Sequence, residues 1–423
     1  MLTNIFNLYS SQEKFSEKLV FLILFLFPIA GPVIRHWNTF FFILIMIIAL
    51  YFLITKKDRK PLYQEEKIFL WVFFLFFCVF IVSAVVNGWS YIQTRELDNE
   101  SRFLLFIPIY LLIREYNFSK KAFFAGILLS IPVIFLFSLY EYIYNILYLP
   151  DKSLNGVYSQ IFIGPIAALS LLMSYHAYKE WIKDQKKNQW LIFGYVAMGL
   201  FIIIFSQARL AYFTIIGGAV ILLFIVTKSL QKKISGFALI ILIVISSYQI
   251  DIVKNRTNLA IENVTNYFEQ VDDINKIEMT SFGLRLEVWR SSQYSLKEHP
   301  FIGIGNGNYI EFIQKYIDQG LVSRHVVTMV QAHNTFIEAI ISKGSIGFIL
   351  LLMIFYYPMY IAWKYKHKSY LSFITIATFT TAITLMSTGD SSLINKNNNI
   401  AYLLFFTAVL FSSMIQKVKR TDK

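Results

Sequence analysis

The chain has little cysteine and little charge for its length. Among its 423 residues there is a single cysteine, Cys78, which lies inside an apolar run. One cysteine excludes an intrachain disulfide and a zinc cluster built on cysteines. Only 15% of the residues are charged, whereas about 25% is usual in soluble proteins. The low charge argues against a soluble globular protein.

Motifs of nucleotide and metal chemistry are also missing. The chain contains no Asp-x-Asp pair, no His-Glu-x-x-His pattern and no P-loop. Such motifs supply the carboxylates, imidazoles or glycine-rich loops that hold metal ions and nucleotides. Their absence disfavours a glycosyltransferase that uses a nucleotide sugar through a metal. We expect no metal site and no cofactor.

Long apolar runs make up most of the chain, which is 56% hydrophobic. Apolar runs of roughly 18 residues or more are typical of membrane helices. The runs are continuous rather than alternating, so helices are favoured over barrel strands. The sequence therefore predicts an all-α polytopic membrane protein with about twelve transmembrane helices. We place them at 19–34, 37–54, 68–87, 103–113, 122–147, 159–176, 190–205, 209–227, 234–250, 345–363, 369–387 and 399–416.

Two of these runs need comment. The run at 19–34 lacks a small-residue cleavage site, so we expect it to remain as the first span. The run at 103–113 is short, and it is tilted, interfacial or extended by flanking polar residues. It matters because removing it would invert the orientation of every later span.

The basic residues are distributed unequally between the two predicted sides of the membrane. The formal net charge of +13 suggests nucleic acid at first sight, but basic residues of membrane proteins usually mark cytoplasmic loops. With a cytoplasmic N-terminus, the short cytoplasmic segments hold 24 of the 39 basic residues, and the short segments opposite hold seven. Both termini are therefore predicted to be cytoplasmic, and no nucleic-acid partner is expected.

The segment 251–332 is the one long polar stretch, and it falls on the outer side. Tyr309, Ile313 and Tyr316 recur in it at helical spacing. We expect a helical subdomain on the outer side here, between transmembrane helices in 1–250 and in 333–423.

The same topology collects the polar groups that are able to do chemistry on the outer face. They include Arg35, Arg102, Arg209, Arg285, Arg290, His333 and Asp390. If the protein has an active site, we expect it on this side.

Arg209 is the most informative of these residues. It follows the run ending "IIIFSQA" almost directly, and a charge near membrane depth is costly unless it faces a cavity or binds a partner. The alternative is an arginine whose side chain reaches back to the outer headgroups.

The segment "SFGLRLEVWRSSQYSLKEHPFIGIGNGNY" carries two further arginines. If residues 284–297 are helical, Arg285 and Trp289 share a face and Arg290 points elsewhere. Arginines followed by a glycine-rich turn suit an anionic, phosphate-bearing ligand. A surface helix with a solvated charged face is the alternative.

His333 lies where this loop meets the next apolar run. Histidine is a common proton acceptor in enzymes, so His333 is a candidate for that role. An interfacial histidine without a chemical role is the alternative, with Asn334 as a helix cap. Asp390 lies in the short outer loop "STGDSSLINK", where a turn-forming aspartate is also common.

Together these residues resemble the O-antigen ligase family, bacterial inner-membrane enzymes of lipopolysaccharide biosynthesis. The resemblance rests on an Arg that opens the eighth span, on "R-x-x-x-W…P-x-x-G-x-G-x-x-x-Y" and on "H-N-T-F-I-E-x-x-x-x-K-G-x-x-G". The specific motifs cover about 284–309 and 333–347. Phe213 stands where the family pattern has Leu, an apolar exchange.

The resemblance implies a glycosyltransferase that moves a glycan from undecaprenyl pyrophosphate to lipid A–core on the periplasmic face. Arg209, Arg285 and His333 match the family's essential residues, and Asp390 matches a late acidic residue less securely. The two arginines are implied to hold the pyrophosphate, and His333 to take the proton of the acceptor hydroxyl. A single displacement would invert the anomeric centre. Further expected substrate contacts are Arg290, Asn334, Asp390, Arg35 and Arg102.

Other functions remain open from the sequence. An O-antigen polymerase or a protein O-oligosaccharyltransferase would use the same donor, although the latter are usually longer. A transporter of lipid-linked sugars would carry charged residues within several spans. Apart from Glu141, the predicted spans are nearly free of charge.

Overall fold

The computed structural model describes residues 2–148, 160–181, 189–270 and 280–420, and no strand occurs among them. The first helices are α1 (Leu2–Ser10), α2 (Phe15–Ala30), α3 (Trp37–Thr55), α4 (Gln64–Val86), α5 (Tyr91–Ile113), α6 (Ser119–Tyr148), α7 (Gln160–Trp181), α8 (Gln189–Phe205) and α9 (Arg209–Val226). They are followed by α10 (Leu230–Ser247), α11 (Asp251–Gln270), α12 (Ser281–Glu298), α13 (Tyr309–Asp318) and the 3₁₀ helix η2 (Arg324–Thr328). The chain continues through α14 (Thr335–Lys364), α15 (Tyr370–Gly389), α16 (Ser392–Asn395) and α17 (Asn397–Arg420).

A helix lies at each of the predicted spans, namely α2 to α10, α14, α15 and α17. Eight helices of the described chain are long and apolar enough to cross a membrane. The all-α polytopic fold is thus confirmed. The short run at 103–113 is the second half of α5, which begins at Tyr91 in a capping box of Ser90 and Gln93. Of the expectations for that run, the one that flanking polar residues extend the helix is confirmed.

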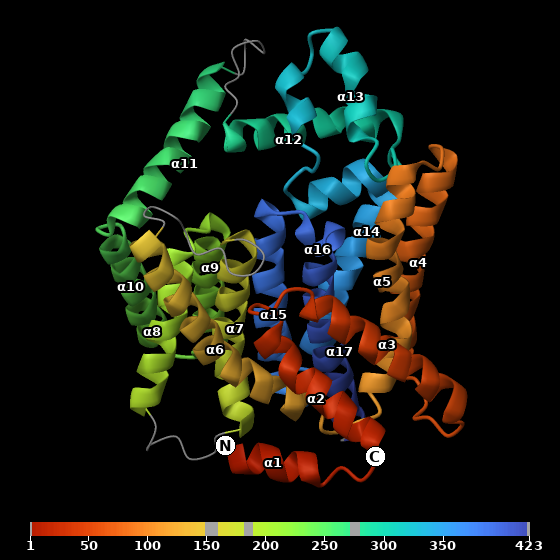
Figure 1. Ribbon diagram of the computed structural model, residues 1–423, viewed down its shortest axis with the longest axis vertical. Helices are drawn as coiled ribbons and strands as arrows, with labels where there is room; N and C mark the ends of the chain where they lie inside the picture. Colours follow the sequence, from red (N-terminus) through yellow and green to blue (C-terminus); the bar gives the residue numbers. More distant parts are fainter. Residues whose placement is uncertain (1, 149–159, 182–188, 271–279, 421–423) are drawn as a thin grey trace.

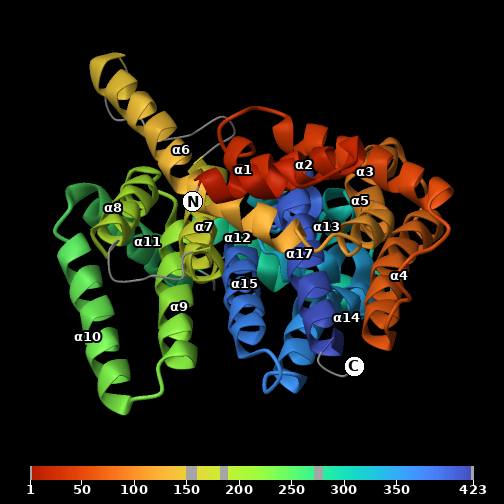
Figure 2. The same ribbon diagram turned by 90° about the horizontal axis from the view of Figure 1, so that it is seen from below.

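The helices divide the molecule into a bundle and a cap. Figure 1 shows α11, α12 and α13 beyond one end of the bundle, whereas both chain termini lie at the opposite end. This arrangement agrees with two termini on one side and the polar segment on the other. Seen from below, α9 and α10 lie at the edge of the bundle (Figure 2), and α10 has no buried residue. Its apolar surface is suited to face lipid.

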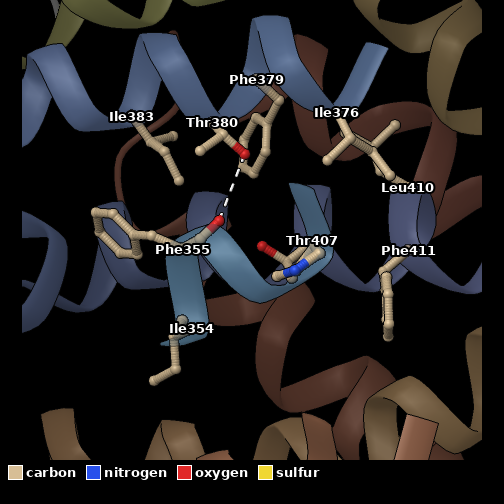
Figure 3. A pocket seen from close by; sticks show the side chains of 10 residues that line it. Ile354, Phe355, Ile376, Phe379, Thr380, Ile383, Thr407, Leu410 and Phe411 are labelled. Carbon is tan, nitrogen blue, oxygen red and sulfur yellow. Dashed lines mark hydrogen bonds between the residues drawn. The ribbon is translucent and has the colours of Figure 1, made fainter. Parts of the chain in front are cut away.

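The core of the bundle is aromatic and centres on α17. The helix is apolar over most of its surface, as expected for a helix enclosed by others. Phe405 stacks on Phe27 of α2 with ring centroids 4.1 Å apart, and Phe406 stacks on Phe379 of α15. A small pocket between α14, α15 and α17 is lined mainly by apolar side chains such as Phe355, Phe379 and Leu410 (Figure 3). None of the predicted site residues lines it.

The glycine-rich turn after α12 packs against a break in α14. Gly303 has φ 67°, and a Cβ atom there would lie 2.5 Å from the backbone N of Lys343. The N–H of Ile304 donates to Ile341 O at 2.9 Å. Opposite the turn, Gly344 leaves the helical conformation with φ 63°. Close contact between two backbones therefore explains Gly303 and Gly344.

A fully buried ion pair closes the same junction. Lys343 Nζ lies 2.7 Å from Glu100 Oε1 of α5, and both side chains are 0% exposed. Asn306 of the glycine-rich turn donates to the same carboxylate oxygen at 2.9 Å, and Lys343 lies over the Phe76 ring. One polar cluster thus joins α5, the turn that follows α12, and α14.

Candidate active site

Arg209 is the first residue of α9, at the end of the bundle that faces α11 and α12. The preceding Ala208 has no side-chain cap, so the free N–H groups and the helix dipole favour an anion at this end. Arg209 is half-buried. Among the residues the structure describes, its guanidinium has no hydrogen bond or ion pair.

Arg285 of α12 reaches the same place from the cap. Its Nη1 donates to Gly389 O at 3.4 Å, and its Nε is buried without a partner in the described chain. Burial lowers the pKa of Arg285, the carboxylate of Asp390 raises it, and the charge of Arg209 lowers it again. The three side chains, from α9, α12 and the end of α15, are therefore close enough to interact electrostatically.

His333 completes the group just before α14. Its Nδ1 lies 3.8 Å from Asp390 Oδ1, too long for a hydrogen bond, and makes no hydrogen bond within the described chain. The backbone of His333 is left-handed, with φ 49°. Left-handed residues other than glycine are uncommon and cluster at functional sites. Catalytic hydrogen bonds are often long before substrate binds.

Two hydrogen bonds clamp the peptide groups next to His333. Trp289 Nε1 donates to Ala332 O at 2.7 Å, and the N–H of Ala332 donates to Glu338 Oε2 at 2.8 Å. Arg285 and Trp289 therefore do share one face of α12, as their spacing predicted. The clamp ties the position of His333 to both the cap and α14.

Asn334 and Thr335 attach the start of α14 to the end of α15. Asn334 caps α14 by accepting hydrogen bonds from the backbone of the first turn, and its amide donates to Thr388 O at 3.3 Å. Thr335 Oγ1 donates to Asp390 O at 2.7 Å. These contacts account for Asn334 without a ligand and fix the peptides that carry His333 and Asp390.

We expect Trp289→Phe to lower the turnover number about three- to tenfold, the range expected for one lost hydrogen bond. The ring is retained while the donor to Ala332 O is removed, so His333 is held less firmly. Steady-state transfer assays should show this fall with little change in the donor KM. Trp363→Phe, on an exposed tryptophan at the other end of α14, is the control. A change confined to the donor KM would contradict a positioning role.

Arg290 is directed away from this group. Its guanidinium donates to both carboxylate oxygens of Glu287 and to Leu321 O. Glu287 is fully buried and also accepts from the N–H of Ser323 and from Tyr267. Arg290 thus anchors the carboxylate that joins α11, α12 and the segment before η2.

The remaining predicted arginines lie elsewhere in the fold. Arg35 is exposed in the turn between α2 and α3. Arg102 is buried in α5 with Asp98 as its ion-pair partner at 3.7 Å and the Phe42 ring beneath it. No hydrogen bond or ion pair of the described chain joins either arginine to His333 or Asp390. Substrate contacts of Arg35 and Arg102 therefore stay predictions.

The structure adds residues that sequence reasoning missed. Glu338 is part of the clamp, and its place in the motif "H-N-T-F-I-E" was the available signal. Gln207 and Arg256 form a further pair beside Arg209, and no local pattern pointed to them. Among the described residues, no group of three or more His, Cys, Asp or Glu side chains is placed so that it could hold a metal ion.

Comparison with known proteins fits this geometry. Residues 194–352 match the family model described as O-antigen ligase. Over these residues the chain is therefore similar to the O-antigen ligase family. The O-antigen ligase domain contains Arg209, Arg285 and His333, whereas Asp390 lies beyond its end.

A relative covers more of the chain than the domain does. A protein of Haemophilus influenzae described as uncharacterized is 27% identical over 363 residues, which is 82% of this chain and 86% of the relative. The similarity therefore extends beyond the O-antigen ligase domain.

Proposed function

We propose that this protein transfers a glycan from undecaprenyl pyrophosphate to lipid A–core on the periplasmic face of the inner membrane. One observation carries the proposal. Arg209, Arg285, His333 and Asp390 converge from four separate segments. Helix α12, which carries Arg285, lies beyond the end of the bundle opposite the termini (Figure 1). Guanidinium groups suit a pyrophosphate, and an imidazole beside a carboxylate suits a proton transfer.

The proposed reaction is a single displacement. The acceptor hydroxyl oxygen attacks the anomeric carbon of the glycan as the bond from that carbon to the pyrophosphate oxygen breaks. The hydroxyl proton passes to His333 Nε2, and Asp390, which faces Nδ1, stabilises the imidazolium. Undecaprenyl pyrophosphate leaves with the electron pair, and the anomeric configuration inverts.

The arginines act on the leaving group. Arg209 and Arg285 neutralise the charge that develops on the pyrophosphate oxygen as the bond breaks. Loss of one such preorganised donor lowers rates by about 10²–10³ in other enzymes. The donor bond already has a good leaving group, so no nucleotide is required.

Reconstitution tests the function. Purified protein is mixed with undecaprenyl-pyrophosphate-linked glycan and with lipopolysaccharide that lacks O-antigen. A glycan attached to lipid A–core supports the ligase. Chains that lengthen only on the polyprenyl carrier indicate a polymerase, and absence of both products would refute either transferase.

We expect Arg209→Lys to lower transfer by about 10²–10³. Lysine retains the charge but lacks the planar fork that binds two phosphate oxygens. Arg324→Lys, an exposed conservative change in η2, should leave transfer unchanged. Initial rates at saturating acceptor provide the comparison, and near-normal rates for Arg209→Lys would argue against a pyrophosphate clamp.

A further inference from the structure

Helix α11 carries an arginine to the loop that precedes Arg209. Arg256 Nε and Nη2 both donate to Gln207 Oε1, at 2.9 and 2.7 Å. Gln207 has φ 54° and, like His333, is one of the few described non-glycine residues with positive φ. A strained residue two positions before Arg209 thus determines where the Arg256 guanidinium lies.

Among the described residues, positive charge is in excess around Gln207 and Arg256. Arg256 lies near enough to Arg209 to repel it, and Arg209 repels Arg285 in turn. Within the described chain, neither Arg209 nor Arg256 has a carboxylate partner, and Asp390 is the carboxylate that acts on Arg285. Among the described residues, three guanidinium groups therefore lie beside one carboxylate, an excess of positive charge that favours a ligand with more than one negative charge.

Other arginines of the chain show how a structural guanidinium is held here. Arg114 pairs with the buried Glu66 at 2.8 Å, and Arg290 pairs with the buried Glu287. Arg256 instead has the neutral amide of Gln207, which orients the guanidinium without neutralising it. Its Nη1 makes no hydrogen bond within the described chain. The arrangement holds Arg256 in place and leaves its charge for a ligand.

We propose that Arg256 is a third pyrophosphate-binding residue, positioned by Gln207, which makes the site prefer a diphosphate lipid over a monophosphate lipid. The proposal rests on the proposed function and specifies its donor site. A second phosphate group adds the charge and the oxygen atoms that a third guanidinium binds. The carrier released by transfer is also a diphosphate, so Arg256 would bind both donor and product.

Binding of two lipids to the purified full-length protein tests this. The dissociation constants of undecaprenyl pyrophosphate and undecaprenyl monophosphate are measured by thermophoresis in detergent. Arg256→Gln should weaken pyrophosphate binding about tenfold, the effect of one charge-assisted hydrogen bond, and change monophosphate binding much less. Lys254→Gln removes the same charge from an exposed position of α11 and should leave both constants within about twofold.

A second variant tests the pairing itself. Gln207→Glu supplies a carboxylate to Arg256 at nearly the same size, so it should also weaken pyrophosphate binding by neutralising the guanidinium. Equal pyrophosphate affinity in wild type and Arg256→Gln would overturn the inference.

Arg209→Lys, measured in parallel, separates the failure of this inference from the failure of the proposed function. If Arg209→Lys weakens pyrophosphate binding and Arg256→Gln does not, only the inference about Arg256 fails. If neither variant weakens pyrophosphate binding, the proposed donor site fails as well.

Discussion

Replacing His333 by asparagine should reduce glycan transfer by about 10²–10⁴, the usual contribution of a general base. Asparagine, like histidine, tolerates the left-handed backbone found at this position. The variant therefore keeps the loop conformation and removes only the group that accepts the proton. His333→Ala should lose a similar amount of activity and some local order, because alanine is less suited to positive φ.

The measurement compares transfer rate with folding and donor binding. His333 makes no described side-chain hydrogen bond, so the thermal midpoint and the pyrophosphate affinity of His333→Asn should stay near wild type. His325→Asn, in η2 of the same outer segment, is the matched control and should retain full transfer. A rate within tenfold of wild type in His333→Asn would rule out its role as general base.

Replacing Lys343 by methionine should cause the largest loss of stability. The change removes the partner of Glu100, whose carboxylate stays fully buried at the junction of α5 and α14. Breaking one half of a buried ion pair costs about 3–5 kcal/mol, because the remaining charge is uncompensated. The thermal midpoint in detergent should fall by several degrees.

A double variant distinguishes the ion pair from simple loss of packing. Lys343→Met combined with Glu100→Gln removes both charges, so much of the lost stability should return. Lys396→Met, on an exposed lysine of the α15–α17 connection, should leave the midpoint unchanged. If the double variant is no more stable than Lys343→Met alone, the uncompensated carboxylate is not the cause.

The helices were predictable because membrane crossing imposes a strong local pattern. A continuous apolar run can satisfy its backbone in lipid only by forming a helix, and every predicted run is helical. A helix cap was also predictable from the sequence. Asn334 was expected to cap the next helix, and it does. The spacing of Arg285 and Trp289 correctly placed them on one face of α12, with Arg290 on another.

Interactions between distant segments were not predictable in the same way. Two arginines five residues apart, Arg285 and Arg290, carry the same charge and lie in one helix. The first faces Asp390 from a later loop, whereas the second pairs with Glu287. Gly303 of the glycine-rich turn permits close contact with the backbone of α14, which the local pattern did not indicate. For Arg285 and for Gly303 the deciding partner comes from another part of the chain.

The sequence by itself determined the spans, the side on which the polar residues collect and the identity of Arg209, Arg285 and His333 as candidates. Each follows from local rules, since apolar length, charge asymmetry and motif spacing act within short stretches. The tertiary structure alone decided which polar side chains meet. It joined Asp390 to His333, Arg256 to Gln207 and Lys343 to Glu100 across 57, 49 and 243 positions. Such pairings depend on helix packing, which no local pattern in the chain encodes.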